Sequence, residues 1–243
     1  MKIDIVIPVY NEAGNIKKNL DSIQKGIAGS SDEHTVDIVY DFEEDNTLPV
    51  VRSIQSRYKF TINLVKNKKS GVCSAIKTGF DNATGDYVLV TMADGSDDYT
   101  TLPRMADKAR EGFDVVCASR YMKGGNIYGG PFVKKTLSRL AGLSLNLFTG
   151  IPTHDITNSY KLYKRAMLKN LVIESDAGFE ISIELPAKAF VQGYKITEIP
   201  SNWHDRTEGK SRFKLFKWLP KYMRWYWFLL SNIFNRKTEK NAA

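Results

Sequence analysis

A turn with three carboxylates, Asp94-Gly-Ser-Asp-Asp98, follows the apolar segment 87–90. An uninterrupted apolar segment predicts a central parallel strand buried on both faces, and open α/β sheets bind their ligands at the carboxyl ends of such strands. Carboxylate oxygens are hard donors, which suit a divalent cation and, through it, a phosphate. The alternative is a helix start capped by Ser96 or Asp97, because these residue types are common at that position.

Two earlier turns carry residues that suit a nucleotide. The first expected strand, Ile3–Pro8, ends in a proline that stiffens the chain and leads to Tyr10 and Glu12, and Asp41 ends the second strand. The ring of Tyr10 can stack on a base, and the two carboxylates can accept hydrogen bonds from ribose hydroxyls or base N–H groups. The alternative is an ordinary capped connection from strand to helix, and the acidic residues after Asp41 are interpreted as a solvated turn.

The elements that must position these residues alternate between strand and helix. Strand patterns lie at Ile3–Pro8, Val36–Tyr40, Thr61–Val65, Tyr87–Thr91 and Val115–Ser119, and helical patterns at Asn15–Gln24, Leu48–Arg57, Val72–Asn82 and Leu102–Glu111. The alternation predicts an α/β fold with a doubly wound, mainly parallel sheet flanked by helices. Right-handed crossovers then place the turns at Tyr10, Asp41, Lys66 and Asp94 along one edge of the sheet, so that they converge on one cleft.

The pattern changes after residue 120. A Gly-rich segment, 123–131, predicts a mobile loop of the kind that closes over a substrate, and a helix with Lys134, Lys135 and Arg139 follows it. The uncharged segment 140–153 is too short to span a membrane, so we expect a partly buried or interfacial helix. Further strands are expected at Ile156–Tyr163 and Tyr194–Ile199, with a helix at Phe179–Phe190 between them.

Size and cysteine content favour a single intracellular domain. The chain has 243 residues, of which 42% are hydrophobic, enough for one large core and a small appendage. We therefore expect a domain at 1–212 and a separate segment at 213–243. Cys73 and Cys117 lie in apolar settings without metal-ligand spacing, which predicts core thiols in a reducing compartment. The first residues resemble a strand rather than a signal peptide, which predicts a cytoplasmic protein.

The positive charge is concentrated at the end of the chain. The formal net charge is +8, and residues 203–243 hold ten Lys or Arg against three Asp or Glu. The nearly neutral remainder argues against a nucleic-acid-binding protein and favours one local anionic partner. Aromatic and basic residues are interleaved in 213–243, which predicts amphipathic helices lying at an anionic membrane surface. The alternative is a terminal helix packed on the core with its basic residues outward.

The motifs, in this order along the chain, resemble those of family 2 glycosyltransferases with the GT-A fold. They are PVYNEAGN, VYDFEEDNT, the segment from Asn67 to Asp98, ASRY, HDITNSYK and WHDRTEGKSRF, and they extend from residue 3 to about residue 214. Within this family the chain most resembles dolichyl-phosphate mannose synthase and related transferases that use polyprenyl phosphates. The resemblance implies a sugar transferase that takes a nucleoside-diphosphate-sugar as its donor.

For the donor, the resemblance implies a metal site and a nucleoside site. Asp94 would hold Mg²⁺ or Mn²⁺ on the donor's diphosphate, with Ser96 or Asp97 supplying a second protein oxygen. Met92 stands where the family has the first Asp of Asp-x-Asp, and a thioether does not suit a hard cation. The nucleoside would be bound by the following residues: Pro8, Tyr10, Glu12 and Asp41. Tyr40 and Phe42 depart from the family pattern on either side of Asp41, the residue expected to contact the donor's base.

For the phosphates and the acceptor, the resemblance points to five further positions and a catalytic set. Arg120 matches the arginine of a Gly/Ala-Ser-Arg-Tyr motif and can grip phosphate oxygens with two N–H groups; the alternative is a surface ion pair. Arg206, Lys210 and Ser211 match a basic loop near the donor diphosphate. Asp155 matches a segment that faces the sugar or the acceptor. The catalytic residues expected are then Asp94, Arg120 and Asp155.

The resemblance and the basic aromatic segment together predict an inverting transferase at the cytoplasmic membrane face with a polyprenyl phosphate as acceptor. A lipid monophosphate, with a second pKa near 6, is a nucleophile without a dedicated base. One alternative is a family member with a saccharide hydroxyl as acceptor, which needs a base such as Asp155 or Glu180. Another is a catalytically weak sugar-nucleotide-binding module, since Met92 replaces a metal ligand.

Overall fold

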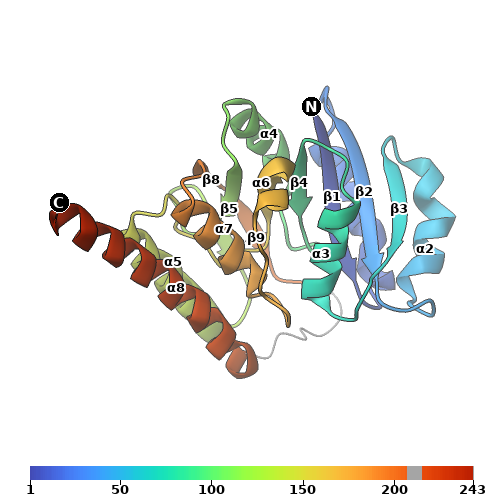
Figure 1. Cartoon of the computed structure of the whole chain (residues 1–243). Coiled ribbons are helices and arrows are strands. Elements are labelled where there is room, and N and C mark those ends of the chain that lie inside the picture. Colours follow the sequence, from blue (N-terminus) through green and yellow to red (C-terminus); the bar gives the residue numbers. More distant parts are fainter. Residues whose placement is uncertain (207–214, 243) are drawn as a thin grey trace.

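The computed structural model describes residues 1–206 and 215–242, with the side chains of the last helix described from 218 to 234. At its centre lies a seven-stranded sheet in the order β3-β2-β1-β4-β7-β5-β8 (Figure 1). Its strands are β1 (Lys2–Val9), β2 (Glu33–Tyr40), β3 (Thr61–Lys66), β4 (Tyr87–Val90), β5 (Val115–Ser119), β7 (Lys161–Lys164) and β8 (Ile196–Pro200). A two-stranded sheet joins β6 (Asn126–Tyr128) to β9 (Asn202–His204).

Helices cover both faces of the large sheet. They are α1 (Ala13–Gly26), α2 (Thr47–Ile54), α3 (Val72–Asn82), α4 (Leu102–Arg110), α5 (Phe132–Thr149), α6 (Arg165–Asn170), α7 (Ile181–Val191) and α8 (Leu215–Ala242). Apolar side chains of α1, α2 and α4 share one core with the sheet, and those of α3, α5, α6, α7 and α8 share the other. Long α5 and α8 lie side by side beyond α7 (Figure 1).

The mainly parallel sheet expected from the sequence is confirmed. β1 pairs in parallel with β2 on one side and with β4 on the other, so the strand order reverses at β1. The exception is β7, which runs antiparallel between β4 and β5. Reversal of the order opens a crevice at the carboxyl ends of β1 and β4, where α/β sheets bind ligands. The turns after β1, β2 and β4 meet at this edge.

The expected strand Ile156–Tyr163 is mostly wrong, because β7 begins only at Lys161. The cause is the buried side chain of Lys161, whose Nζ donates to the carbonyls of Ile156, at 2.9 Å, and of Asn158. A buried ammonium group needs such acceptors, and here it holds the chain ahead of β7 in a loop.

Two other segments differ from the expectation. The Gly-rich segment 123–131 contains β6, which pairs in parallel with β9 and is therefore not an irregular loop throughout. The helix expected at Leu48–Arg57 ends at Ile54 and continues as the short 3₁₀ helix Gln55–Arg57. The pairing of β6 joins residues more than seventy positions apart, which local patterns cannot reveal.

The remaining expectations concern the thiols and the last segment. Cys73 and Cys117 are buried free thiols, as predicted. Trp225 and Leu229 of α8 are buried in the core that also contains α7. A domain boundary at 212/213 stays a prediction. None of the helices in the described parts of the chain combines the length and the apolar character needed to cross a membrane.

Candidate active site

A cavity of about 750 Å³ lies at the reversal of the strand order and extends toward α5 and α8. Its walls at the sheet edge come from the turns after β1, β2 and β4 and from the start of α3. These turns contribute Pro8, Val9, Tyr10, Glu12, Asp41, Ser70, Gly71, Val72, Met92, Ala93, Asp94, Ser96 and Asp97. The predicted convergence on one cleft is therefore observed for all four turns, although Lys66 itself is not part of the cavity wall.

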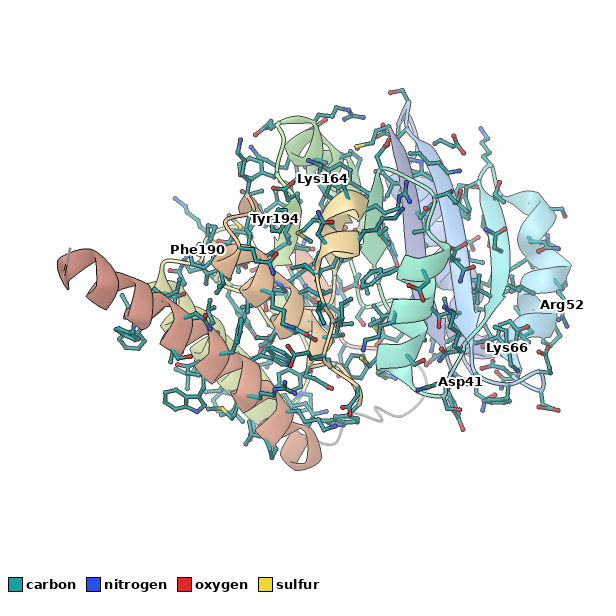
Figure 2. All side chains as sticks on the ribbon, in the orientation of Figure 1. Asp41, Arg52, Lys66, Lys164, Phe190 and Tyr194 are labelled. Carbon is teal, nitrogen blue, oxygen red and sulfur yellow. The ribbon has the colours of Figure 1, made fainter. Side chains whose placement is uncertain are left out.

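Lys66 is the exception. Its Nζ lies 3.2 Å from Glu43 Oε1 and 5.2 Å from the centre of the Tyr40 ring, and Lys66 is not part of the cavity wall. Figure 2 shows Lys66 on β3 and Asp41 at the end of β2. The loop that follows Lys66 reaches the cavity instead, through Ser70 and Gly71.

The carboxylate of Asp94 is held from two sides. Its Oδ1 accepts hydrogen bonds from the backbone N–H of Ser96, at 3.2 Å, and from the Ser96 hydroxyl. Its Oδ2 lies 2.8 Å from Nη2 of Arg206, and the Asp94 side chain is only 11% exposed. A positive charge thus occupies the face of Asp94 where the sequence predicts a metal ion.

Asp97 lines the same cavity but faces inward. Its Oδ2 accepts from the Thr91 hydroxyl at 2.7 Å, and burial raises the pKa of this carboxyl to about 7. The helix cap considered for Ser96 or Asp97 is made by Asp98, whose side chain accepts from the backbone N–H of Thr100 at 3.1 Å. That alternative is therefore wrong for Ser96 and Asp97, because the residue that caps the helix is Asp98. Asp94 and Ser96 both line the cavity.

Hard oxygen donors suited to Mg²⁺ or Mn²⁺ are present on Asp94 and Ser96, and Arg206 shows that the position accommodates a cation. Asp97 would have to turn from Thr91 to join them. Among the described residues, no group of three or more His, Cys, Asp or Glu side chains is arranged to hold a metal. The residues present therefore fit a metal that is bound by one carboxylate and completed by donor phosphates and water.

The turn after β1 presents Tyr10, whose side chain is 43% exposed and whose ring meets Phe42 edge to face, with centroids 5.1 Å apart. Glu12 Oε2 accepts from Asn15 Nδ2 at 2.8 Å. The turn has Asn11 at a φ of 56°, a left-handed conformation that asparagine tolerates, and the Asn11 N–H donates to Asp45. The sequence thus places an aromatic ring and a carboxylate at the cavity.

Asp41 directly follows β2 at the cavity wall, and both of its carboxylate oxygens accept hydrogen bonds. Oδ1 accepts from Asn67 Nδ2 at 2.7 Å, and Oδ2 accepts from the backbone N–H of Gly71 at 2.9 Å. The carboxylate therefore positions the loop that leads into α3, and each oxygen keeps a lone pair for a ligand donor.

Arg120 follows β5 and is held by Asp155. Its Nε and Nη2 donate to the two Asp155 oxygens at 2.6 and 2.9 Å, and Asp155 is completely buried. Burial alone would raise the pKa of Asp155, but the charge and hydrogen bonds of Arg120 outweigh it and hold that pKa below its usual value. Arg120 lines the cavity and Asp155 does not. Asp155 thus fixes the guanidinium, and direct contact of Asp155 with sugar or acceptor stays an untested prediction.

Beyond Arg120 the cavity wall changes to side chains of α5, α7 and α8. The polar ones are Lys134, Lys135 and Ser138, and the apolar ones include Leu137, Ala141, Ile183, Leu219 and Met223. The Ser138 hydroxyl accepts from Arg120 Nη2 at 3.2 Å, which connects α5 to the arginine. The sequence had shown the basic start of this helix but no link from it to Arg120.

The other predicted phosphate ligands divide into two groups. Arg206 lines the cavity, as Arg120 does. Lys210 and Ser211 lie outside the described residues, so their place at the donor phosphates stays a prediction.

The family model for glycosyl transferase family 2 matches residues 4–172, more than half of the chain. The chain belongs to glycosyl transferase family 2. The expected family and the GT-A type of fold are thereby confirmed.

Two curated relatives share most of the chain's length. A dolichol-phosphate mannosyltransferase of Pyrococcus furiosus is 26% identical over 218 residues, which are 88% of this chain and 60% of that protein. A polyprenol monophosphomannose synthase of Mycolicibacterium smegmatis is 28% identical over 214 residues, 86% of this chain and 79% of that protein. The chain therefore spans about three-fifths of the length of the Pyrococcus relative.

Among solved structures, glucosyl-3-phosphoglycerate synthase from Mycobacterium tuberculosis has the same fold. Its complex with Mn²⁺, UDP and glucosyl-3-phosphoglycerate aligns with a TM-score of 0.67 and 18% identity, over 96% of this chain and 80% of that one. The S. aureus protein TarS aligns with a TM-score of 0.57 and 21% identity, over 84% of this chain and 60% of that one.

Proposed function

We propose that this family 2 glycosyltransferase transfers a sugar, with inversion, from a nucleoside-diphosphate-sugar to a polyprenyl phosphate. The observation that carries the proposal is the cavity itself. One end holds the nucleotide-type residues and Asp94, and the other end is lined by Lys134 and Lys135 and by apolar side chains of α5, α7 and α8. A ligand with a polar diphosphate and a ligand with an apolar chain can therefore meet in one space.

The distribution of charge favours a phosphate as the acceptor. The carboxylates among the described lining residues are Glu12, Asp41, Asp94 and Asp97, all at the sheet edge. Beside α5 the described wall carries Arg120, Lys134 and Lys135 and no carboxylate. A hydroxyl acceptor would need a base there, whereas a phosphate monoester is already ionised near neutral pH and needs cations that orient it.

In this proposal Tyr10, Glu12, Pro8 and Asp41 bind the nucleoside. Arg120, with Lys134 or Lys135, holds the acceptor phosphate so that its oxygen faces the sugar's anomeric carbon. The bond from that carbon to the donor diphosphate breaks as the bond to the acceptor oxygen forms on the opposite side. The nucleoside diphosphate leaves with the bonding electrons, and Arg206 stabilises its charge.

Asp94 and Ser96 would hold the Mg²⁺ or Mn²⁺ ion. The metal, when bound, neutralises the negative charge that develops on the departing diphosphate. The Mn²⁺ and Mg²⁺ complexes of the Mycobacterium synthase, a protein of the same fold, support a divalent ion of this kind. The names of the two curated relatives support a polyprenol-type acceptor.

The exposed surface of α5 and α8 supports contact with a membrane. The apolar outer face comprises exposed hydrophobic side chains of both helices: Phe132, Val133, Leu140, Leu147, Phe148, Trp227 and Phe234. The helices are in contact, since the Tyr226 hydroxyl lies 2.9 Å from that of Ser144. Such a face beside the end of the cavity that α5 and α8 line can lie in the headgroup region and receive the lipid acceptor from the bilayer.

The function is tested by product formation. The full chain is incubated with Mn²⁺, a short polyprenyl phosphate and a panel of UDP-, GDP- and dTDP-sugars, and the lipid fraction is examined by mass spectrometry. We expect a polyprenyl monophospho-sugar from one donor and none when EDTA is present. Transfer to a saccharide or to phosphoglycerate, with no lipid product from any donor, would contradict the proposed acceptor.

A further inference from the structure

The ion pair between Asp94 and Arg206 joins two residues that the proposed function assigns to different ligands. Asp94 is assigned to the metal and Arg206 to the donor's diphosphate, yet Arg206 Nη2 lies 2.8 Å from Asp94 Oδ2. The other oxygen, Oδ1, accepts from the backbone N–H of Ser96 at 3.2 Å. A cation that binds Asp94 through Oδ2 therefore has to displace the guanidinium.

Among the residues that the structure describes, no second carboxylate is in place to hold the cation with Asp94. Met92 carries a thioether where a carboxylate would stand two residues before Asp94. Asp97 is turned inward, with Oδ2 on the Thr91 hydroxyl at 2.7 Å. A divalent ion and a guanidinium on one carboxylate repel each other, and this part of the cavity supplies little further negative charge until a diphosphate arrives.

The backbone before Arg206 is fastened to the acidic turn, so the exchange is a movement of the side chain. Trp203 forms a β-bridge with Asp97, and the His204 N–H donates to the Ser96 carbonyl at 3.0 Å. The Asp205 N–H donates to the carbonyl of Tyr128 in β6 at 2.9 Å. The guanidinium thus stays close to Asp94 and can turn between it and a ligand in the cavity.

We propose that Arg206 is a tethered cation that competes with the divalent metal for Asp94, and that the donor's diphosphate ends this competition by taking Arg206 from the carboxylate. The proposal rests on the proposed function, because it takes a metal at Asp94 and a diphosphate in the cavity as given. Metal and donor then bind with positive coupling, since each removes an obstacle to the other. The protein holds the metal weakly until the nucleotide is present.

The test measures Mn²⁺ binding to the full chain by the electron paramagnetic resonance signal of the free ion, with no nucleotide or acceptor present. Arg206→Gln removes the competing charge and keeps a polar side chain. We expect it to bind Mn²⁺ about tenfold more tightly than the wild type, within the usual range of coupling between sites. Saturating UDP or GDP, whichever binds, should bring the wild type close to the variant.

A matched control separates the contact from general charge. Arg104→Gln removes the same charge from a side chain that donates to the Pro200 carbonyl at 2.8 Å, and it should leave Mn²⁺ affinity within about twofold. Equal Mn²⁺ affinities of the wild type and Arg206→Gln would overturn the competition and leave the proposed function standing. Failure of both proteins to bind Mn²⁺ would overturn the competition together with the metal role of Asp94.

Discussion

Residues that follow strands of the parallel sheet line the cavity and could be predicted from the strand patterns, with the exception of Lys66. Asp94, Tyr10 and Asp41 all follow strands of the parallel sheet, and each reaches the cavity. The role of Asp155 could not be predicted in the same way. It lies in a loop whose path depends on Lys161, and its burial against Arg120 is a tertiary contact across 35 residues.

Asp94 is predicted to be necessary for metal-dependent transfer. Asp94→Asn keeps the shape but loses the charge that a hard cation needs, so the Mn²⁺-dependent rate should fall at least about 100-fold. The matched control is Asp98→Asn, which alters a capping carboxylate four residues away and should cost about 1 kcal/mol of stability at most. Steady-state rates across a Mn²⁺ titration decide the outcome, and an equal loss in both variants would contradict the assignment.

Lys161 is predicted to make stability rise with pH. Burial lowers the pKa of Lys161 from 10.5 to about 8. Between these values the unfolded chain holds the proton and the folded protein has released it, so the free energy of unfolding increases with pH. At about 1.4 kcal/mol per pKa unit, the increase is about 3.5 kcal/mol.

Urea unfolding of the wild type and of Lys161→Met from pH 7 to 10.5 measures this effect. The difference between the two curves isolates Lys161, because all other groups are shared. Curves that run parallel over the whole range would show that Lys161 keeps its ordinary pKa in the folded protein.

At the scale of elements, the alternating pattern predicted the parallel strands and their helices well, because apolar residues recur at a different spacing in strands and in helices. It could not predict pairings between distant segments. β7 enters the sheet antiparallel between β4 and β5, and β6 pairs with β9. Local sequence patterns likewise do not predict that α5 packs beside α8. They therefore could not predict the end of the cavity that these helices line.

The apolar outer face of α5 and α8 is predicted to bind anionic membranes. Leu147 is 77% exposed and Trp227 is 60% exposed, so Leu147→Glu with Trp227→Glu should leave stability nearly unchanged while reducing vesicle binding at least about tenfold. The control is Val172→Glu, a change at a 75% exposed residue outside both helices. Cosedimentation with phosphatidylglycerol vesicles gives the answer, and equal loss in the control would show that the effect is only added negative charge.

At the scale of the whole molecule, one cavity connects the edge of the large sheet to side chains of α5 and α8. The strand order places the proposed donor end, and the position of α5 and α8 on the second face of the sheet places the proposed acceptor end. The sequence predicted both partners from its motifs and its basic aromatic segment. The two ends form one cavity only in the folded chain, because α5 and α8 begin about 80 residues apart in the sequence.

We expect this cavity to select a phosphate that is attached to an apolar chain. The most direct test is kcat/KM for a short polyprenyl phosphate compared with ethyl phosphate, with the same donor and Mn²⁺. Each buried methylene contributes about 0.8 kcal/mol, so a few isoprene units in contact with the α5 and α8 walls predict a preference of at least about 100-fold for the polyprenyl phosphate. Equal values for the two acceptors, or faster transfer to ethyl phosphate, would contradict the account.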